Sequence, residues 1–222
     1  MRSQCTLVFF ALFALAGCAA KKHYSDYFAH EPRSILVVPA LNETTAVDAE
    51  SVYMTTVTRP LAERGFYVFP VYLTESLFRD LGLPEAGLVH QLPLERFRED
   101  FGADAVLFVT IKGWSNKYVV LQSSTVVTVS FVLKDTRTGT VLWESTQSAA
   151  RNSSNGGGGG VAGLIVMAIE AAATYAVNQM VDIDYRPLAL QANTQAFVTP
   201  GVGLPAGPYH PDFGKDKDRY SP

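Results

Sequence analysis

The sequence predicts an α/β fold built on a single mixed sheet, with a parallel β-α-β start, an antiparallel meander and flanking helices. Residues 34–41 form a short apolar run, long enough for a buried strand and too short for a helix. Residues 47–64 carry apolar side chains at near-helical spacing, and Gly65 follows where a helix C-cap belongs. Residues 66–71 are the next apolar run, and we expect them to pair in parallel with the first strand. The flanking helices are expected at residues 73–81 and 93–101.

The middle of the chain predicts the antiparallel part of the sheet. Residues 105–112 are typical of a buried strand, and residues 125–134 alternate between apolar and hydroxyl-bearing side chains. Residues 135–139 end in a glycine and predict a turn, after which residues 140–147 return as the partner strand. The side chains expected to face the core from the second strand are Val127, Val129, Phe131 and Leu133.

The N-terminus has the pattern of an export and lipidation signal. Residues 6–16 are apolar, too few to span a bilayer, which takes about 20 residues, but within the roughly 7–15 of a signal-peptide core. Residues 15–18, Leu-Ala-Gly-Cys, resemble a bacterial lipobox. We therefore expect cleavage between Gly17 and Cys18 and attachment of lipid to Cys18. Because Ala19 follows rather than aspartate, the enterobacterial sorting rule favours the outer membrane. An ordinary secretory signal with an incidental cysteine is the alternative.

Composition divides the chain into four segments. Residues 1–17 are expected to be the lipoprotein signal peptide and residues 18–30 a lipidated tether without apolar periodicity. Residues 31–184 hold the apolar runs and are expected to form one periplasmic α/β domain. Residues 185–222 become rich in proline and glycine and then charged, which predicts an extended or partly disordered C-terminal tail.

Composition also excludes several classes of function. Hydrophobic residues make up 48% of the 222-residue chain and charged residues 18%, a balance that allows a packed core. Lysine and arginine number 18 against 21 acidic residues, so the formal charge of −3 disfavours nucleic-acid binding. The two cysteines are Cys5 and Cys18, so the rest of the chain offers no disulfide and no cysteine metal site.

No catalytic arrangement emerges from the motifs. The histidines, His23, His30, His90 and His210, lack the H-E-x-x-H spacing of a zinc site, and no serine stands in G-x-S-x-G. The glycines at 156–160 are not followed by the lysine and hydroxyl residue that a phosphate loop needs, so a flexible hinge is the better interpretation. We expect no enzymatic activity, no cofactor and no metal.

Two further segments leave alternatives open. Residues 161–181 are the most apolar part of the mature chain, with Glu170 as their only charge. This helix could cover the sheet, present a surplus apolar face for self-association, or enter the bilayer. Residues 207–211, Gly-Pro-Tyr-His-Pro, suit either an extended peptide docked in a groove or a plain linker end.

Several sequence strings together resemble a family of bacterial lipoproteins of unknown function that includes a meningococcal surface-antigen candidate. These strings lie at residues 34–39, 60–71, 101–105, 135–139, 142–143 and 207–211. The resemblance implies a fold similar to the periplasmic part of the curli secretion lipoprotein CsgG, to LpoB and to the N-terminal domain of TolB. It also implies a genetic association with a CsgG-like lipoprotein, and it transfers no catalytic residue.

The expected function is therefore that of a lipid-anchored, non-enzymatic scaffold or accessory subunit. It would serve an envelope transport, secretion or surface-assembly complex, with a CsgG-like partner, the membrane through its anchor, and a homo-dimer or homo-oligomer as its contacts. An LpoB-like regulator of peptidoglycan synthesis and a periplasmic ligand-binding lipoprotein are the alternatives. The anchor would raise the local concentration of the domain near its partners.

Overall fold

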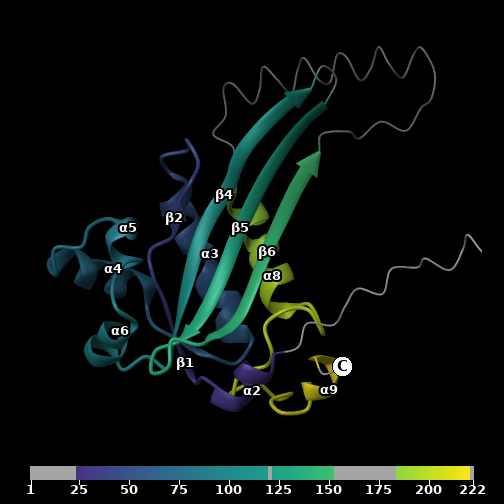
Figure 1. Ribbon diagram of the computed structural model, residues 1–222. Helices are drawn as coiled ribbons and strands as arrows, with labels where there is room; N and C mark the ends of the chain where they lie inside the picture. Colours follow the sequence, from purple (N-terminus) through teal and green to yellow (C-terminus); the bar gives the residue numbers. More distant parts are fainter. Residues whose placement is uncertain (1–23, 120–121, 153–183, 221–222) are drawn as a thin grey trace, which may run out of the picture.

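The computed structural model describes residues 24–119, 122–152 and 184–220 (Figure 1). Its strands are β1 (Ser34–Val37), β2 (Leu41–Asn42), β3 (Tyr67–Val68), β4 (Ala105–Val119), β5 (Gln122–Asp135) and β6 (Val141–Asn152). Its helices are α2 (Ser25–His30), α3 (Ala49–Glu63), α4 (Val71–Asp80), α5 (Ala86–Val89), α6 (Leu94–Phe101), α8 (Arg186–Val198) and α9 (Lys217–Tyr220).

The strands form one mixed sheet in the order β3-β1-β4-β5-β6, and β2 pairs with β4 beyond the end of β1. β1 is parallel to both β3 and β4, with Ile35 opposite Val68 on one side and Ala105 on the other. β4, β5 and β6 are antiparallel. Both halves of the predicted sheet, the parallel β-α-β start and the antiparallel meander, are therefore confirmed.

One face of the sheet is covered by α3 and α8, which lie together against it in Figure 1. The inward residues predicted for β5 are all buried in this core, together with Trp143 of β6 and Phe197 of α8. Asn193 of α8 is fully buried, accepts a hydrogen bond from the Tyr53 hydroxyl at 2.9 Å and donates one to Thr56 at 3.0 Å. This polar link fixes α8 on α3, because a buried amide left unpaired would destabilise the fold.

Among the described residues, α4, α5 and α6 cover one end of the opposite face, and they group beside β1 and β4 in Figure 1. Alternation along β1 sends Leu36 to this side, where Phe78 of α4 and Phe97 of α6 complete a second, smaller core. Farther along β5 and β6 this face carries exposed hydroxyl pairs, Thr128 with Ser148 at 2.8 Å and Ser130 with Thr146 at 3.0 Å. The three long strands thus extend beyond the helices as a polar-faced ribbon.

The C-terminal region differs from the extended or partly disordered tail predicted for residues 185–222. Residues 186–198 form α8, whose Leu188 and Phe197 are buried in the main core. Residues 199–220, here called the C-terminal strap, then run back along the domain and bury Leu204 and Tyr220. The boundary predicted at residue 184 is wrong, because the folded domain continues through the strap.

The boundary predicted between a tether and a domain at residue 31 is also wrong. α2 lies inside the predicted tether, yet its Tyr27 is fully buried and joins the main core. α2 ends at Glu31, which adopts the left-handed conformation at φ 42°. The folded domain therefore includes residues 24–30 of the predicted tether, and Tyr24 is itself buried.

Candidate functional site

Helix α4 is apolar on two faces, and the domain buries only one of them. Thr74 and Phe78 point inward and are almost fully buried. Leu73, Leu77 and Leu81, spaced four residues apart along and just beyond α4, are between 39% and 63% exposed. Since residues four apart share one helix face, these leucines form a continuous outward ridge, the α4 leucine row. Contiguous exposed apolar surface of this kind marks interaction sites in soluble domains, whereas single exposed leucines do not.

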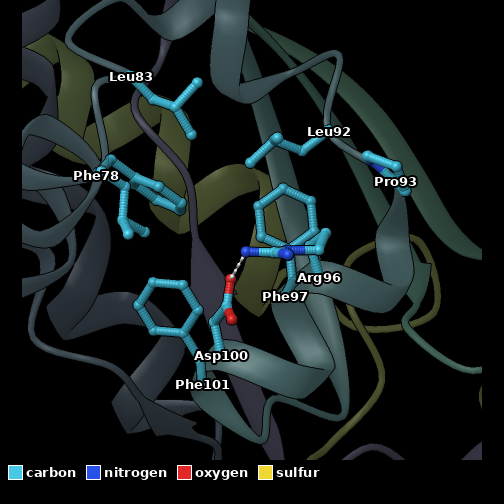
Figure 2. Close-up of a pocket in the computed structure, with 9 residues that line it drawn as sticks. Phe78, Leu83, Leu92, Pro93, Arg96, Phe97, Asp100 and Phe101 are labelled. Carbon is cyan, nitrogen blue, oxygen red and sulfur yellow. Dashed lines mark ion pairs between the residues drawn. The ribbon is translucent and has the colours of Figure 1, made fainter.

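A pocket of about 330 Å³ opens beside the leucine row, between α4 and α6. Figure 2 shows Phe78, Phe97 and Phe101 around the pocket, with Leu83 and Leu92 above these rings in the view. The rings of Phe78 and Phe97 meet edge to face at 6.1 Å. At the mouth, Arg96 and Asp100 form an ion pair at 3.1 Å across one turn of α6 (Figure 2). The pocket therefore suits an apolar side chain or a small apolar group flanked by polar atoms.

The local sequence explains why α6 presents this wall. Pro93 precedes its first turn and Gly102, at φ 70°, ends it in the left-handed conformation that glycine adopts without strain. Phe97 is fully buried, while Glu95 and Glu99 are exposed. The sequence predicted both helices but not the outward leucine row, although its four-residue spacing was visible.

Near the C-terminal end of α3, a buried ion pair holds the C-terminal strap. Arg64, just after α3, is bonded to Asp216 at 3.0 Å, with only 10% and 3% of the two side chains exposed. The Arg64 guanidinium also donates to the Leu204 carbonyl at 2.7 Å and to the Tyr220 hydroxyl at 3.1 Å. Asp216 in turn accepts the Ala206 amide at 2.9 Å. The Arg64 guanidinium thus has several hydrogen-bond partners, which a buried charge needs in order to be tolerated. Both bonds that Asp216 accepts fall on its Oδ2, and its buried Oδ1 has no hydrogen-bond partner among the described residues.

The segment at 207–211 docks against the same chain rather than extending into solvent. The Gly207 amide donates to the Arg64 carbonyl at 2.9 Å and the Tyr209 amide to the Gly65 carbonyl at 3.1 Å. Gly65 lies at φ 88°, and a Cβ there would overlap His210. A Cβ on Gly207 would overlap the Gly65 carbonyl in the same way. Two glycines facing each other therefore allow the strap to lie directly on the backbone after α3.

A polar cleft of about 560 Å³ lies where α2, the β5–β6 turn and the strap meet. Two of its carboxylates are engaged by the fold: Asp104 accepts the Ser34 amide and hydroxyl, each at 3.1 Å, and Asp135 accepts hydrogen bonds within its own turn. Burial raises the pKa of Asp135, but hydrogen bonds from Thr138 and Arg137 outweigh it and lower the pKa below its usual value. These carboxylates serve to join segments of the chain.

The three histidines that the structure describes, His30, His90 and His210, do not converge on one site. His90 is bonded to the Pro39 carbonyl at 2.9 Å, and burial lowers its pKa. His30 is bonded to the Asp26 carbonyl at 2.8 Å, and His210 accepts the Asp212 amide at 3.0 Å. Within the described ranges, no group of three or more histidine, cysteine or acidic residues is placed to hold a metal ion.

Three predicted features lie outside the described residues. These are the cleavage and lipidation site at Gly17 and Cys18, the glycines at 156–160, and the apolar segment 161–181. His23 lies there too. Across the described parts of the chain, no helix combines the length and apolarity needed to cross a bilayer.

Comparison with known proteins places the chain in a family. The family model described as "Putative lipoprotein GNA1162-like" matches residues 22–209. The chain belongs to this family. The "Putative lipoprotein NMB1124/NMB1162" of Neisseria meningitidis serogroup B is 34% identical over 180 residues, which are 79% of this chain and 82% of that protein.

Solved structures agree with this assignment. The crystal structure of lipoprotein GNA1162 from Neisseria meningitidis is 34% identical, has a TM-score of 0.54 and covers 67% of this chain and 98% of that one. The LpoB C-terminal domain from Salmonella enterica is 19% identical, with a TM-score of 0.39, and covers 52% of this chain and 81% of that one. The family model and the GNA1162 structure confirm the predicted family, and with the mixed sheet described above they confirm the α/β fold class. The names of the family and of its meningococcal member describe a lipoprotein and mention no reaction.

Proposed function

We propose that this GNA1162-like protein is an outer-membrane lipoprotein, anchored through Cys18 after cleavage behind Gly17, that acts as a non-enzymatic scaffold or accessory subunit. Its complex would carry out envelope transport, secretion or surface assembly together with a CsgG-like lipoprotein. The α4 leucine row and the adjoining pocket are the contact surface. The observation that carries the proposal is the row itself, because Leu73, Leu77 and Leu81 are exposed on a helix whose other apolar face is already buried.

The chemistry of this surface defines the partner it would accept. A ridge of leucines at four-residue spacing packs into the groove of a second helix, and the pocket beside it accepts a side chain in return. The Arg96–Asp100 pair at the pocket mouth supplies one charge of each sign at the rim. An amphipathic helix of an envelope partner, with an apolar anchor and charged flanks, fits this arrangement.

The experiment compares Leu77→Lys with Leu190→Lys in the full-length protein. Leu190 lies on α8 and is 38% exposed, close to the 39% of Leu77, so it is a matched control. After crosslinking in intact envelopes and pull-down, we expect wild type and Leu190→Lys to recover the CsgG-like partner and Leu77→Lys to lose it. Equal recovery by all three would refute the contact surface. Mass spectrometry of the mature N-terminus tests the anchor separately, as a diacylglycerol mass on Cys18.

A periplasmic ligand-binding role remains a second candidate because the pocket in Figure 2 is lined by phenylalanines. A volume of about 330 Å³ lies at the small end of the roughly 300–1,000 Å³ typical of ligand sites. If the pocket serves a small ligand, Leu83→Trp should abolish ligand binding while crosslinking to the partner persists. Loss of crosslinking would instead assign the pocket to the protein contact.

A further inference from the structure

The starting observation is that α2 is fastened to the domain and cannot act as a spacer. The buried Tyr27 hydroxyl donates to the Ala206 carbonyl at 3.1 Å, and its ring meets Phe28 and Phe66 edge to face at 5.5 and 6.4 Å. The Tyr24 hydroxyl reaches the Glu144 carbonyl at 3.5 Å. Lys217 of α9 lies over the Phe28 ring at 5.4 Å. The domain is therefore held in place at least from Tyr24 onward.

The length of chain before Tyr24 then limits how far the domain can stand from its anchor. Only six residues, 18–23, lie between the predicted cleavage site and Tyr24. Six residues reach at most about 20 Å when fully extended. By contrast, β4 has 15 residues and is about 50 Å long at the usual rise per residue. The chain between the anchor and the domain is therefore less than half as long as the sheet.

Figure 1 shows which parts of the molecule this limit concerns. α2, α9 and the β5–β6 turn lie at one end, and β4 to β6 extend in the other direction as the polar-faced ribbon. Two exposed tyrosines lie at the α2 end. Tyr209 belongs to the strap segment that is bonded to Gly65. Tyr67 belongs to β3, and its amide donates to the Arg33 carbonyl at 3.0 Å. Tyrosine is enriched at membrane–water interfaces, because its ring is apolar and its hydroxyl is hydrated.

We propose that the α2 end, with Tyr209 of the strap, lies against the lipid headgroups, and that the open end of the β4–β6 ribbon points away from the membrane. The partner of this surface is a phospholipid bilayer. The inference rests on the proposed lipidation of Cys18 and adds to it the face of the domain that the bilayer covers. The α4 leucine row would then be presented at the side of a fixed module instead of on a freely tumbling one.

The test uses single-cysteine variants, because the mature chain has no cysteine other than the acylated Cys18. The first variant is Tyr209→Cys, at the α2 end, where the wild-type tyrosine is 68% exposed. The second is Val47→Cys, where the wild-type valine is 96% exposed. Val47 follows β2, which pairs with Thr110 and Ile111 of β4, farther along the ribbon. Each acylated variant is labelled with bimane and placed in phosphatidylethanolamine–phosphatidylglycerol vesicles. Headgroup spin-labelled lipid is the quencher, and circular dichroism confirms folding.

We expect a loss of bimane fluorescence at position 209 and none at position 47. Inserting a long Gly/Ser linker after Ala20 should remove most of the loss at position 209, because the short tether imposes the orientation. Equal quenching at both positions, or quenching at position 47 alone, would overturn the proposal. Vesicle flotation separates the two levels of inference: a variant that does not float contradicts the anchor, and one that floats without quenching at position 209 contradicts only the orientation.

Discussion

The C-terminal strap and helix α4 show opposite relations between composition and burial. The strap is rich in proline, glycine and charge, yet it buries an Arg64–Asp216 ion pair and the side chains of Leu204 and Tyr220. α4 and the residue after it carry three leucines at four-residue spacing, yet this row is exposed. The difference teaches that burial depends on whether the polar groups of a segment find partners within the chain. Apolar surface without a partner in the chain is then available for another molecule.

The largest effect should come from breaking the ion pair of the strap. Arg64→Ala would leave Asp216 buried without its charge partner, and removing one member of a buried pair costs about 3–5 kcal/mol. The control is Arg59→Ala, because Arg59 forms an exposed pair with Glu63 at 2.8 Å. Exposed pairs of this kind contribute little to stability, because water and salt screen the attraction. Urea unfolding measures both, and equal losses would show that the strap does not support the domain.

The next effect should come from separating the strap from α3. Gly207→Ala introduces a Cβ that overlaps the Gly65 carbonyl, and overpacking of this kind costs about 1–3 kcal/mol. Gly87→Ala in α5 is the control, since a Cβ there meets nothing nearby. We expect limited proteolysis to cut the strap of Gly207→Ala first. Strap cleavage at the same rate in both variants would contradict the close contact.

Alkaline pH should weaken the strap end selectively. Burial, aided by the neighbouring Tyr220 and Glu144, raises the pKa of Tyr24 to about 12, and burial also raises the pKa of Tyr220 above its usual 10. Because the folded values exceed the unfolded one, this stabilisation is complete below pH 10 and is lost as the pH rises through the folded values. Unfolding free energies between pH 9 and pH 12 check this. A flat profile would argue against buried phenols.

Acid should weaken the α4–α6 side instead. Burial lowers the pKa of His90 below 6.5, so the unfolded chain binds a proton more readily than the folded one. The neutral imidazole is then fully stabilising above pH 6.5, and this contribution falls as the pH drops below that value. His90→Gln should flatten the stability profile between pH 7 and pH 5. If wild type and variant lose stability in parallel over that range, another group is responsible.

The smallest effect is expected on the leucine row. Leu77→Lys should change the unfolding free energy by no more than about 0.5 kcal/mol, because surface substitutions without a folded partner rarely do more. Leu190→Lys should behave in the same way. A large loss of stability for Leu77→Lys alone would show that the row is part of the core of this chain and not a surface for another protein.

Much of the sheet could be predicted from local pattern. The alternation of Val127, Val129, Phe131 and Leu133 gives the buried face of β5 directly, and Gly65 and Gly139 mark real turns at positive φ. These signals depend on residues close in the sequence, so no knowledge of the tertiary structure was needed. The helices at α3, α4 and α6 were predictable for the same reason.

The strap and α8 were not predictable because their partners are far away in the sequence. α8 is held by small alanines and by Asn193, whose bonds to Tyr53 and Thr56 give no signal in a hydropathy pattern. The docking of Gly207 on Gly65 is decided by backbone geometry that composition does not encode. For the candidate site, the spacing of Leu73, Leu77 and Leu81 was visible, but which face of α4 remains exposed depends on where the sheet lies.

Residues from the beginning and the end of the described chain are in contact, and this affects when the fold can be completed. The ring centroids of Tyr24 and Tyr220 lie 6.0 Å apart, and Tyr27 bonds to Ala206, 179 residues later in the chain. Such closures form slowly, since a long loop must be ordered before any contact is gained. Because Ala206 and Tyr220 complete the surroundings of Tyr27 and Tyr24, the described fold cannot close fully until the C-terminal strap has been synthesised.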